Sequence, residues 1–343
     1  ERLRKLTELV QRFLSLQTKP NSQKRLAIYY FKGPGQEALT AQGLEVVPSL
    51  YHFLQRLRSE GYDLTGLPAD EKTFEEQIMR EGPVIQSISG GQMEHYLQTG
   101  NPAWTSKAVF DEWIQHDLTP KQLKELADKY GASPGAYMVR SSKAGTPELA
   151  TTRIQYGNVV ILPQPVAGIG SDNFAIVHGA GAPPPYPYIA AYLWARHTFQ
   201  ADALLHFGTH GSLEFTPQKQ VALGASDWGE ALVAPLPHFY YYTIGNIGES
   251  MMAKRRSYAS LISYITPCRS RVQRERRSDS HGRKGGYTAP SLVSPSRECG
   301  DSPLRRSTCR PVPSQSSLSS EGSDDLRDGA ASICRSRSPP QRR

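Results

Sequence analysis

The chain has 343 residues, of which 38% are hydrophobic, and its formal net charge is +8. Residues 269–343 hold 16 Lys or Arg and 8 Asp or Glu; subtracted from the totals of 40 and 32, this leaves 24 of each for residues 1–268. The basic charge belongs to the C-terminal part alone, so charge does not argue for nucleic-acid binding by the body. No stretch approaches the roughly 18 apolar residues of a membrane span.

The chain opens with a predicted helix, strand and second helix. Apolar residues at helical spacing predict a helix over residues 1–17, interpreted as the end of an upstream helical segment that closes at residue 22. Arg25–Phe31 is typical of a buried strand, and a glycine loop then leads to a predicted helix over Val47–Glu60. Strand, glycine loop and helix are the opening of a βα unit, as in open parallel sheets.

The same alternation continues to residue 267. Further strands are predicted at Asn158–Leu162, Asn173–His178 and Ala203–Phe207, and further helices within 62–82, twice within 104–130, over about Tyr188–Phe199 and over Glu249–Ile265. Residues 23–267 are therefore predicted to form an α/β body with an open, mostly parallel sheet covered by helices.

Residues 268–343 have a different composition. The last 75 residues contain 15 Arg and 17 Ser but no Phe, Trp or Met, which predicts a disordered tail. One interpretation of this segment is an Arg/Ser-rich tail that binds RNA. The other is the product of a frameshift, which the abrupt change in composition favours. All four cysteines lie at or beyond Cys268 and none forms a CxxC pair, so the body reads as cytoplasmic, without a disulfide framework or a zinc-finger motif.

The densest group of reactive side chains follows the predicted strand at Ala203–Phe207. His206, His210 and Glu214 are spaced by four and four, and Gly208 and Gly211 lie between them. Imidazole and carboxylate are good ligands for divalent ions, and the glycines suit a tight turn or a flat ligand. The alternative to a functional site is a structural role, in which the histidines at the end of the strand form hydrogen bonds with the backbone of the loop. Metallohydrolases use the same residue types, so the pattern alone leaves the chemistry open.

A second group of candidate residues lies further along the chain. Lys254, Arg255 and Arg256 follow the start of a predicted helix and are candidates to hold ligand carboxylates or a partner subunit; a solvated charged face is the alternative. Tyr241 lies in a run of three tyrosines, which either stack on a ligand ring or pack in the core. No GxxxxGK[ST] motif is present, so any ATP is expected to be bound by other chains.

Four segments of the body resemble one protein family. They are GNVVILPQP (157–165), HFGTHGSLEFTPQKQ (206–220), YYYTIGN (240–246) and AKRRSYASLISYITP (253–267). All four are similar to the family of cobaltochelatase large (N-type) subunits and magnesium-chelatase H subunits. The resemblance runs from about Arg25 to Pro267 and is weakest around residues 85–145.

The resemblance implies a fragment of a very large, multidomain, tetrapyrrole-binding subunit. Partner AAA+ subunits of such chelatases hydrolyse ATP to drive a divalent ion into the ring, consistent with the missing phosphate loop. The matching motif makes His206, His210 and Glu214 the expected metal-handling and catalytic residues. Gly208, Gly211, Tyr241 and the basic group 254–256 are the expected ring-binding residues. In this reading Glu214 is the base and the histidines guide the ion.

The resemblance does not decide between the two metals. Thr209 and Ser212 follow the version of the motif found in magnesium-type subunits, although large subunits of the cobalt pathway also carry it. We expect Co²⁺ insertion for cobalamin synthesis, with Mg²⁺ insertion into protoporphyrin IX for chlorophyll synthesis as the alternative. Readings from other classes are a zinc-dependent hydrolase that uses the same three residues, and an inactive fragment with a nucleic-acid-binding tail.

Overall fold

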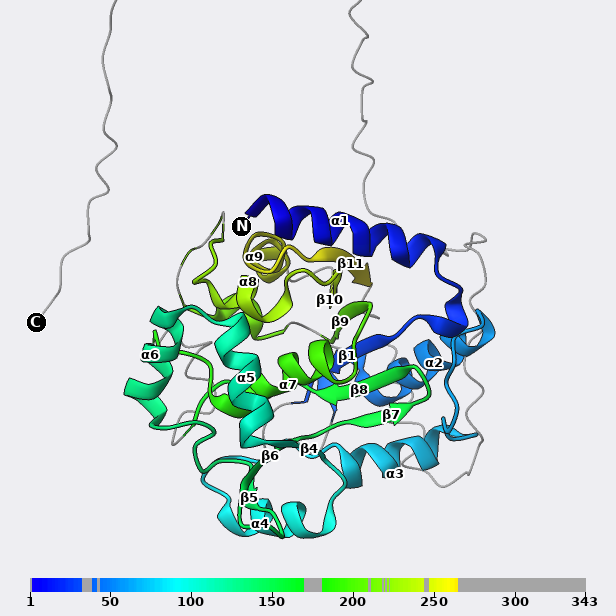
Figure 1. Ribbon diagram of the computed structural model, residues 1–343. Coiled ribbons are helices and arrows are strands. Elements are labelled where there is room, and N and C mark those ends of the chain that lie inside the picture. Colours follow the sequence, from blue (N-terminus) through cyan, green and yellow to red (C-terminus); the bar gives the residue numbers. More distant parts are fainter. Residues whose placement is uncertain are drawn as a thin grey trace, which may run out of the picture. The chain divides into compact units, whose positions relative to one another are not determined.

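The computed structural model describes most of the first 264 residues (Figure 1). The described residues are 2–32, 39–41, 44–169, 181–208, 211–217, 219, 221, 223–243 and 247–264. All belong to the first of two compact units, Glu1–His281. The predicted strand at 173–178 and the predicted disordered tail lie outside these residues.

A six-stranded sheet forms the centre of this unit. Its strands are β1 (Leu26–Tyr30), β7 (Ile154–Tyr156), β8 (Val159–Pro163), β9 (Ala203–Phe207), β10 (His238–Thr243) and β11 (Ser260–Tyr264). They lie in the order β11-β10-β9-β1-β8-β7. Every neighbouring pair is parallel except β7 with β8. The predicted α/β body with a mostly parallel sheet is confirmed.

Helices cover both faces of the sheet (Figure 1). The helices of the described residues are α1 (Arg2–Thr18), α2 (Val46–Ser59), α3 (Glu71–Glu81), α4 (Gly90–Thr99), α5 (Lys107–Asp117), α6 (Pro120–Tyr130), α7 (Tyr186–His197), α8 (Trp228–Val233) and α9 (Ile247–Arg256). Alternate residues of β1 point to opposite faces. Tyr29 joins the core built with α5, α7 and α8, whereas Tyr30 joins the core built with α2 and α3.

Smaller elements complete the described part. They are the pair β2 (Thr40–Ala41) and β3 (Leu44–Glu45), the strands β4 (Ala103–Ser106), β5 (Val139–Ser141) and β6 (Pro147–Thr151), and the 3-10 turns η1 (Asn21–Gln23) and η2 (Leu213–Phe215). β4, β6 and β5 form an antiparallel sheet. No helix among the described residues has the length and apolar character needed to cross a membrane.

Helix α7 explains how the sequence places the site. Nine of its twelve residues are buried, which is typical of a helix enclosed on all sides. Tyr188 and Tyr192 are four residues apart and therefore lie on one face of the helix. Tyr192 stacks on Tyr29 of β1, with ring centroids 4.7 Å apart. The helix thus brings two tyrosines to the strands at the centre of the sheet.

The predicted helix over Glu249–Ile265 is wrong in its second half. Helix α9 ends at Arg256, and Ser260–Tyr264 forms strand β11 at the edge of the sheet. Tyr258 has a φ of 52°, a left-handed conformation that breaks the helix. Five residues of β11 then pair in parallel with β10. This pairing satisfies backbone groups that a longer helix would leave exposed along β10.

Core packing by α2 gives a first testable prediction. Leu54 is fully buried in the core between α2 and the sheet. Leu54→Ala is expected to lower the free energy of unfolding by about 2–5 kcal/mol, because it removes apolar contacts and leaves a cavity. Leu14 on α1 is 54% exposed, so Leu14→Ala should change it by less than about 0.5 kcal/mol. Urea unfolding of both variants checks this, and equal losses would contradict the described core.

Candidate functional site

The candidate site lies where β9 ends, near the middle of the sheet. His206, the fourth residue of β9, is 2% exposed, and its ring packs beside Tyr29 and Tyr192. Open parallel sheets present their ligand sites at the carboxyl ends of the strands. His206 therefore lies at the edge of the sheet where a ligand is expected.

His206 belongs to a buried chain of hydrogen bonds. Its Nε2 is 2.8 Å from the Tyr192 hydroxyl, and its Nδ1 is 2.6 Å from Nε2 of His238 on β10. Nδ1 of His238 lies 3.1 Å from the backbone carbonyl oxygen of Ser257. A carbonyl only accepts, so His238 Nδ1 carries a proton, His206 Nδ1 donates to His238, and Tyr192 donates to His206.

Both imidazoles are neutral at neutral pH. Burial lowers the pKa of His206 well below its ordinary value, and the neighbouring His238 lowers it further. Burial also lowers the pKa of His238 to about 4, although the Ser257 carbonyl opposes this change. A neutral imidazole has one donor and one acceptor nitrogen, which is what the chain of hydrogen bonds requires.

Glu214 is fully buried in the turn η2, close to His206. Its Oε1 accepts a hydrogen bond from the Tyr240 hydroxyl and one from the backbone N–H of Gly211, at 3.2 Å. Burial first, and the Glu214 charge second, raise the pKa of Tyr240 far above its usual value, so Tyr240 stays a donor. The carboxylate is thus held in one orientation.

Gly211 lies between the histidine and the carboxylate. A Cβ at this position would be 3.1 Å from Oε2 of Glu214 and 3.3 Å from Cδ2 of His206. The N–H of Gly211 also donates to the Tyr240 hydroxyl at 2.8 Å. His206, Gly211 and Glu214, predicted as one site, therefore do lie together. His210, the third predicted ion ligand, is outside the described residues.

Gly208 allows β1 and β9 to approach closely at the edge of the site. Its φ is 150°, and a Cβ there would lie 2.4 Å from Cβ of Phe31. Gly208→Ala is expected to lower the free energy of unfolding by about 1–3 kcal/mol through overcrowding. The matched control is Gly90→Ala, because a Cβ at Gly90 would meet nothing within 4 Å. Thermal unfolding that gave equal stability for both variants would contradict the close approach.

The three basic residues of α9 do not act as one group. Lys254 and Arg255 are exposed, whereas Arg256 is buried and donates to the carbonyl oxygen of Thr216. Burial lowers the pKa of Arg256, and the carboxylates of Glu214 and Asp227 oppose this change. The guanidinium thus holds the segment that follows Glu214.

Tyr241 lies on the face of the sheet opposite Tyr240. Its ring stacks on Phe207, with centroids 5.2 Å apart and planes 9° apart, as part of the core beside α2. The structure therefore does not bring Tyr241 together with Glu214. Among the described residues, no three His, Cys, Asp or Glu side chains form a ready-made metal centre.

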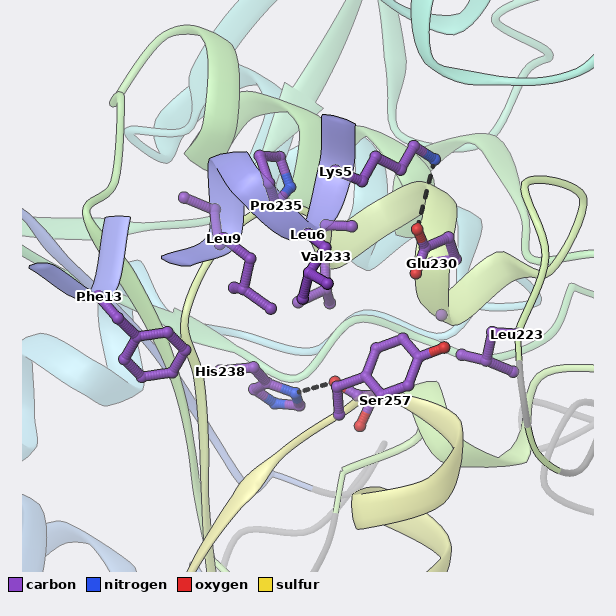
Figure 2. Close-up of a pocket in the computed structure, with 14 residues that line it drawn as sticks. Lys5, Leu6, Leu9, Phe13, Leu223, Glu230, Val233, Pro235, His238 and Ser257 are labelled. Carbon is purple, nitrogen blue, oxygen red and sulfur yellow. Dashed lines mark hydrogen bonds and ion pairs between the residues drawn. The ribbon is translucent and has the colours of Figure 1, made fainter. Parts of the chain in front are cut away.

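A cavity of about 360 Å³ lies beyond the far end of the hydrogen-bond chain (Figure 2). Leu6, Leu9 and Phe13 of α1 contribute apolar lining, and His238 and Ser257 lie on the side toward the sheet. The ion pair of Lys5 and Glu230, 3.5 Å long, closes one side. His238 therefore lies between this cavity and His206.

The positions of Tyr188, Tyr192 and His238 in the site were not predicted. His238 stands outside the four-residue spacing of the histidine motif, and the two tyrosines lie on a helix that precedes it. The spacing of Tyr188 and Tyr192 by four was a usable signal, since it places two hydroxyls on one helix face. The hydroxyl of Tyr188 also forms a hydrogen bond of 2.9 Å with the hydroxyl of Ser212, the residue that follows Gly211.

Comparison with known proteins places the same region in one family. Residues 1–276 match the sequence model of the CobN/Magnesium Chelatase family. The magnesium-chelatase subunit ChlH of Oryza sativa subsp. indica is 33% identical over 269 residues, 78% of this chain and 18% of that protein. The aerobic cobaltochelatase subunit CobN of Pseudomonas aeruginosa is 31% identical over 276 residues, 80% of this chain and 21% of that protein.

A solved structure has the same fold. The catalytic subunit of cobaltochelatase from Mycobacterium tuberculosis superposes with a TM-score of 0.63 at 26% identity, over 81% of this chain and 23% of that chain. The chain thus spans about a fifth of the length of the curated relatives that it matches. On the sequence match and the shared fold together, this chain belongs to the CobN/magnesium chelatase family.

Proposed function

We propose that the chain supplies the metal-handling region of the large, tetrapyrrole-binding subunit of an ATP-dependent chelatase. The reaction inserts Co²⁺ into a corrin-ring precursor, with Mg²⁺ and protoporphyrin as the alternative. ATP is bound and hydrolysed by partner AAA+ subunits, and the site of action is the cytoplasm. The observation that carries the proposal is the buried carboxylate of Glu214, held at the end of β9 beside His206.

Metal insertion needs a proton acceptor close to the ring. The N–H protons at the centre of the ring must leave, and the ion must lose its water ligands. The Glu214 carboxylate is the proposed acceptor, because Tyr240 and the N–H of Gly211 hold Oε1 in place. Holding a base in one orientation before the substrate arrives lowers the cost of reaching the transition state.

His206 and His210 are the proposed guides for the ion. Both ring nitrogens of His206 take part in hydrogen bonds, one with Tyr192 and one with His238. Nε2 can therefore ligate an ion only when the Tyr192 hydroxyl turns away from it. His206 Nδ1 stays bonded to His238, the arrangement by which ligating histidines are commonly oriented.

An insertion assay tests this function. The chain is combined with chelatase ATPase subunits and ATP, and Co²⁺ with a corrin-ring precursor is compared with Mg²⁺ with protoporphyrin. Faster cobalt insertion is the expected result. Faster magnesium insertion would assign the chain to the other branch, and ATP-independent insertion or insertion of neither ion would contradict the proposal.

A further inference from the structure

A lysine lies almost buried at the carboxyl end of β1. Lys32 is 8% exposed, and its Nζ donates to the carbonyl oxygen of Gly82 at 3.2 Å. Burial lowers its pKa. In the sheet, Tyr30 of β1 pairs with Phe207 of β9. Lys32 and Gly208 therefore leave the sheet at the same edge, on neighbouring strands.

Lys32 lines a cavity of about 710 Å³ formed by the end of α3, the start of the next segment and α4. The lining is both apolar and basic. Val84, Ile85 and Tyr96 supply apolar surface, while Lys32 and Arg80 supply positive charge. A flat apolar molecule with an anionic substituent matches this combination.

Among the described residues around the cavity, Lys32 is a cation without an ion-pair partner. Arg80 pairs with Glu81 at 2.7 Å, and these two charges offset each other. In the described ranges no carboxylate forms an ion pair with Lys32, and Gly82 accepts one of its three ammonium hydrogens. A buried charge is costly unless it is paired, so an anion next to Lys32 would lower that cost.

The wall of the cavity is held in place before any ligand binds. Tyr30 donates to the carbonyl oxygen of Gly82 at 3.1 Å, and Tyr96 donates to that of Glu81 at 3.3 Å. Tyr137 donates to the carbonyl oxygen of Ile85. Three side chains thus fix the backbone between α3 and α4, which reduces the entropy lost on binding.

We propose that Lys32 binds a carboxylate side chain of the tetrapyrrole, with part of the ring lying against Val84 and Ile85. This inference rests on the proposed function. Neighbouring strands are about 4.8 Å apart, so a ring placed over the ends of β1 and β9 spans both strands. Lys32 then holds one edge of the ring where β1 ends. Arg256, predicted for the carboxylate role, is instead bonded to Thr216.

A purely structural role for Lys32 makes a different prediction. A lysine that donates to the last carbonyls of a helix stabilises that helix, and Gly82 is the C-cap of α3. Loss of such a role would weaken binding of every ring equally, whatever the charge of the ring. Loss of a carboxylate contact weakens binding of charged rings alone.

The experiment measures the affinity of two proteins for each of two ligands. Wild-type chain and Lys32→Met, both of full length, are titrated with protoporphyrin and with its dimethyl ester, and quenching of tryptophan fluorescence gives each Kd. Lys32→Met is expected to weaken acid binding by about 10- to 100-fold, the range of a charge-assisted hydrogen bond, and to leave ester binding unchanged. Lys32→Arg should recover part of the loss, and the matched control Lys143→Met, at an exposed lysine, should bind both rings like wild type.

Each other outcome overturns the inference in a recognisable way. Equal weakening for acid and ester assigns Lys32 a structural role, and unchanged Kd values for both mean that it does not touch the ligand. Equal affinity of the wild-type chain for acid and ester overturns the inference even if Lys32→Met fails to fold. A wild-type chain that binds neither protoporphyrin nor its ester overturns the inference, and one that also fails to bind a corrin-ring precursor overturns the proposed function as well.

Discussion

Replacing Glu214 with glutamine is expected to slow metal insertion by about 10²- to 10⁴-fold, the usual contribution of a positioned acid or base. Glutamine has nearly the shape of glutamate, and its amide oxygen can still accept from Tyr240 and Gly211. What the variant loses is the ability to take a proton from the ring. Its affinity for tetrapyrrole should therefore stay near that of the wild-type chain.

Two measurements separate this role from a loss of structure. Insertion rates are measured with partner ATPase subunits, and ring affinity is measured by fluorescence quenching on the same preparation. Glu148 on β6 is part of the exposed pair with Arg140, and Glu148→Gln serves as the matched control. Wild-type insertion by Glu214→Gln would remove Glu214 from the reaction, and a parallel loss of ring affinity would assign it to binding.

The second large effect is a loss of stability in mild acid. His206 and His238 are neutral in the folded chain because burial lowers both pKa values, that of His238 to about 4. In the unfolded chain a histidine takes up a proton below about pH 6.5. The two neutral histidines therefore contribute fully to the free energy of unfolding above about pH 6.5, and this contribution falls as the pH drops toward 4. When the pH falls from 7 to 5, the lowered pKa of His238 alone should reduce the free energy of unfolding by about 2 kcal/mol.

His238→Gln tests the origin of this loss. Glutamine can accept from His206 and donate to the Ser257 carbonyl, but it does not titrate in this range. Urea unfolding at pH 7, 6 and 5 should give a shallower pH dependence for this variant than for wild type. His52→Gln, at an exposed position of α2, should leave the pH dependence unchanged. If the free energy of unfolding depends on pH equally in His238→Gln and wild type, the buried histidine pair does not cause the loss of stability in acid.

The order of elements could be predicted where the apolar pattern is strong. The strands at β1, β8 and β9 and the helices α2 and α7 lie within about two residues of their predicted bounds. Strand β11 was mistaken for the end of a helix because its five residues are too few to establish a period. Its position depends on pairing with β10, a contact between segments that local spacing does not reveal.

The candidate site was predictable only as far as one motif extends. His206, Gly211 and Glu214 lie within nine residues of each other, and the turn after β9 brings them together. His238 and Tyr192 reach the same place from β10 and α7, so only the sheet order and helix packing reveal them. Lys32 was missed because a lone lysine after a strand has no distinctive spacing. Its role depends on Gly82 and on the cavity beside it.

Direct binding of a tetrapyrrole tests the central claim most simply. The full-length chain, shown by circular dichroism to be folded, is titrated with protoporphyrin and with a corrin-ring precursor while its tryptophan fluorescence is recorded. Saturable quenching by at least one ring is the predicted result, with preference for the corrin precursor indicating cobalt and preference for protoporphyrin indicating magnesium. A folded chain that shows no saturable quenching with either ring would contradict the proposal that this chain binds the tetrapyrrole.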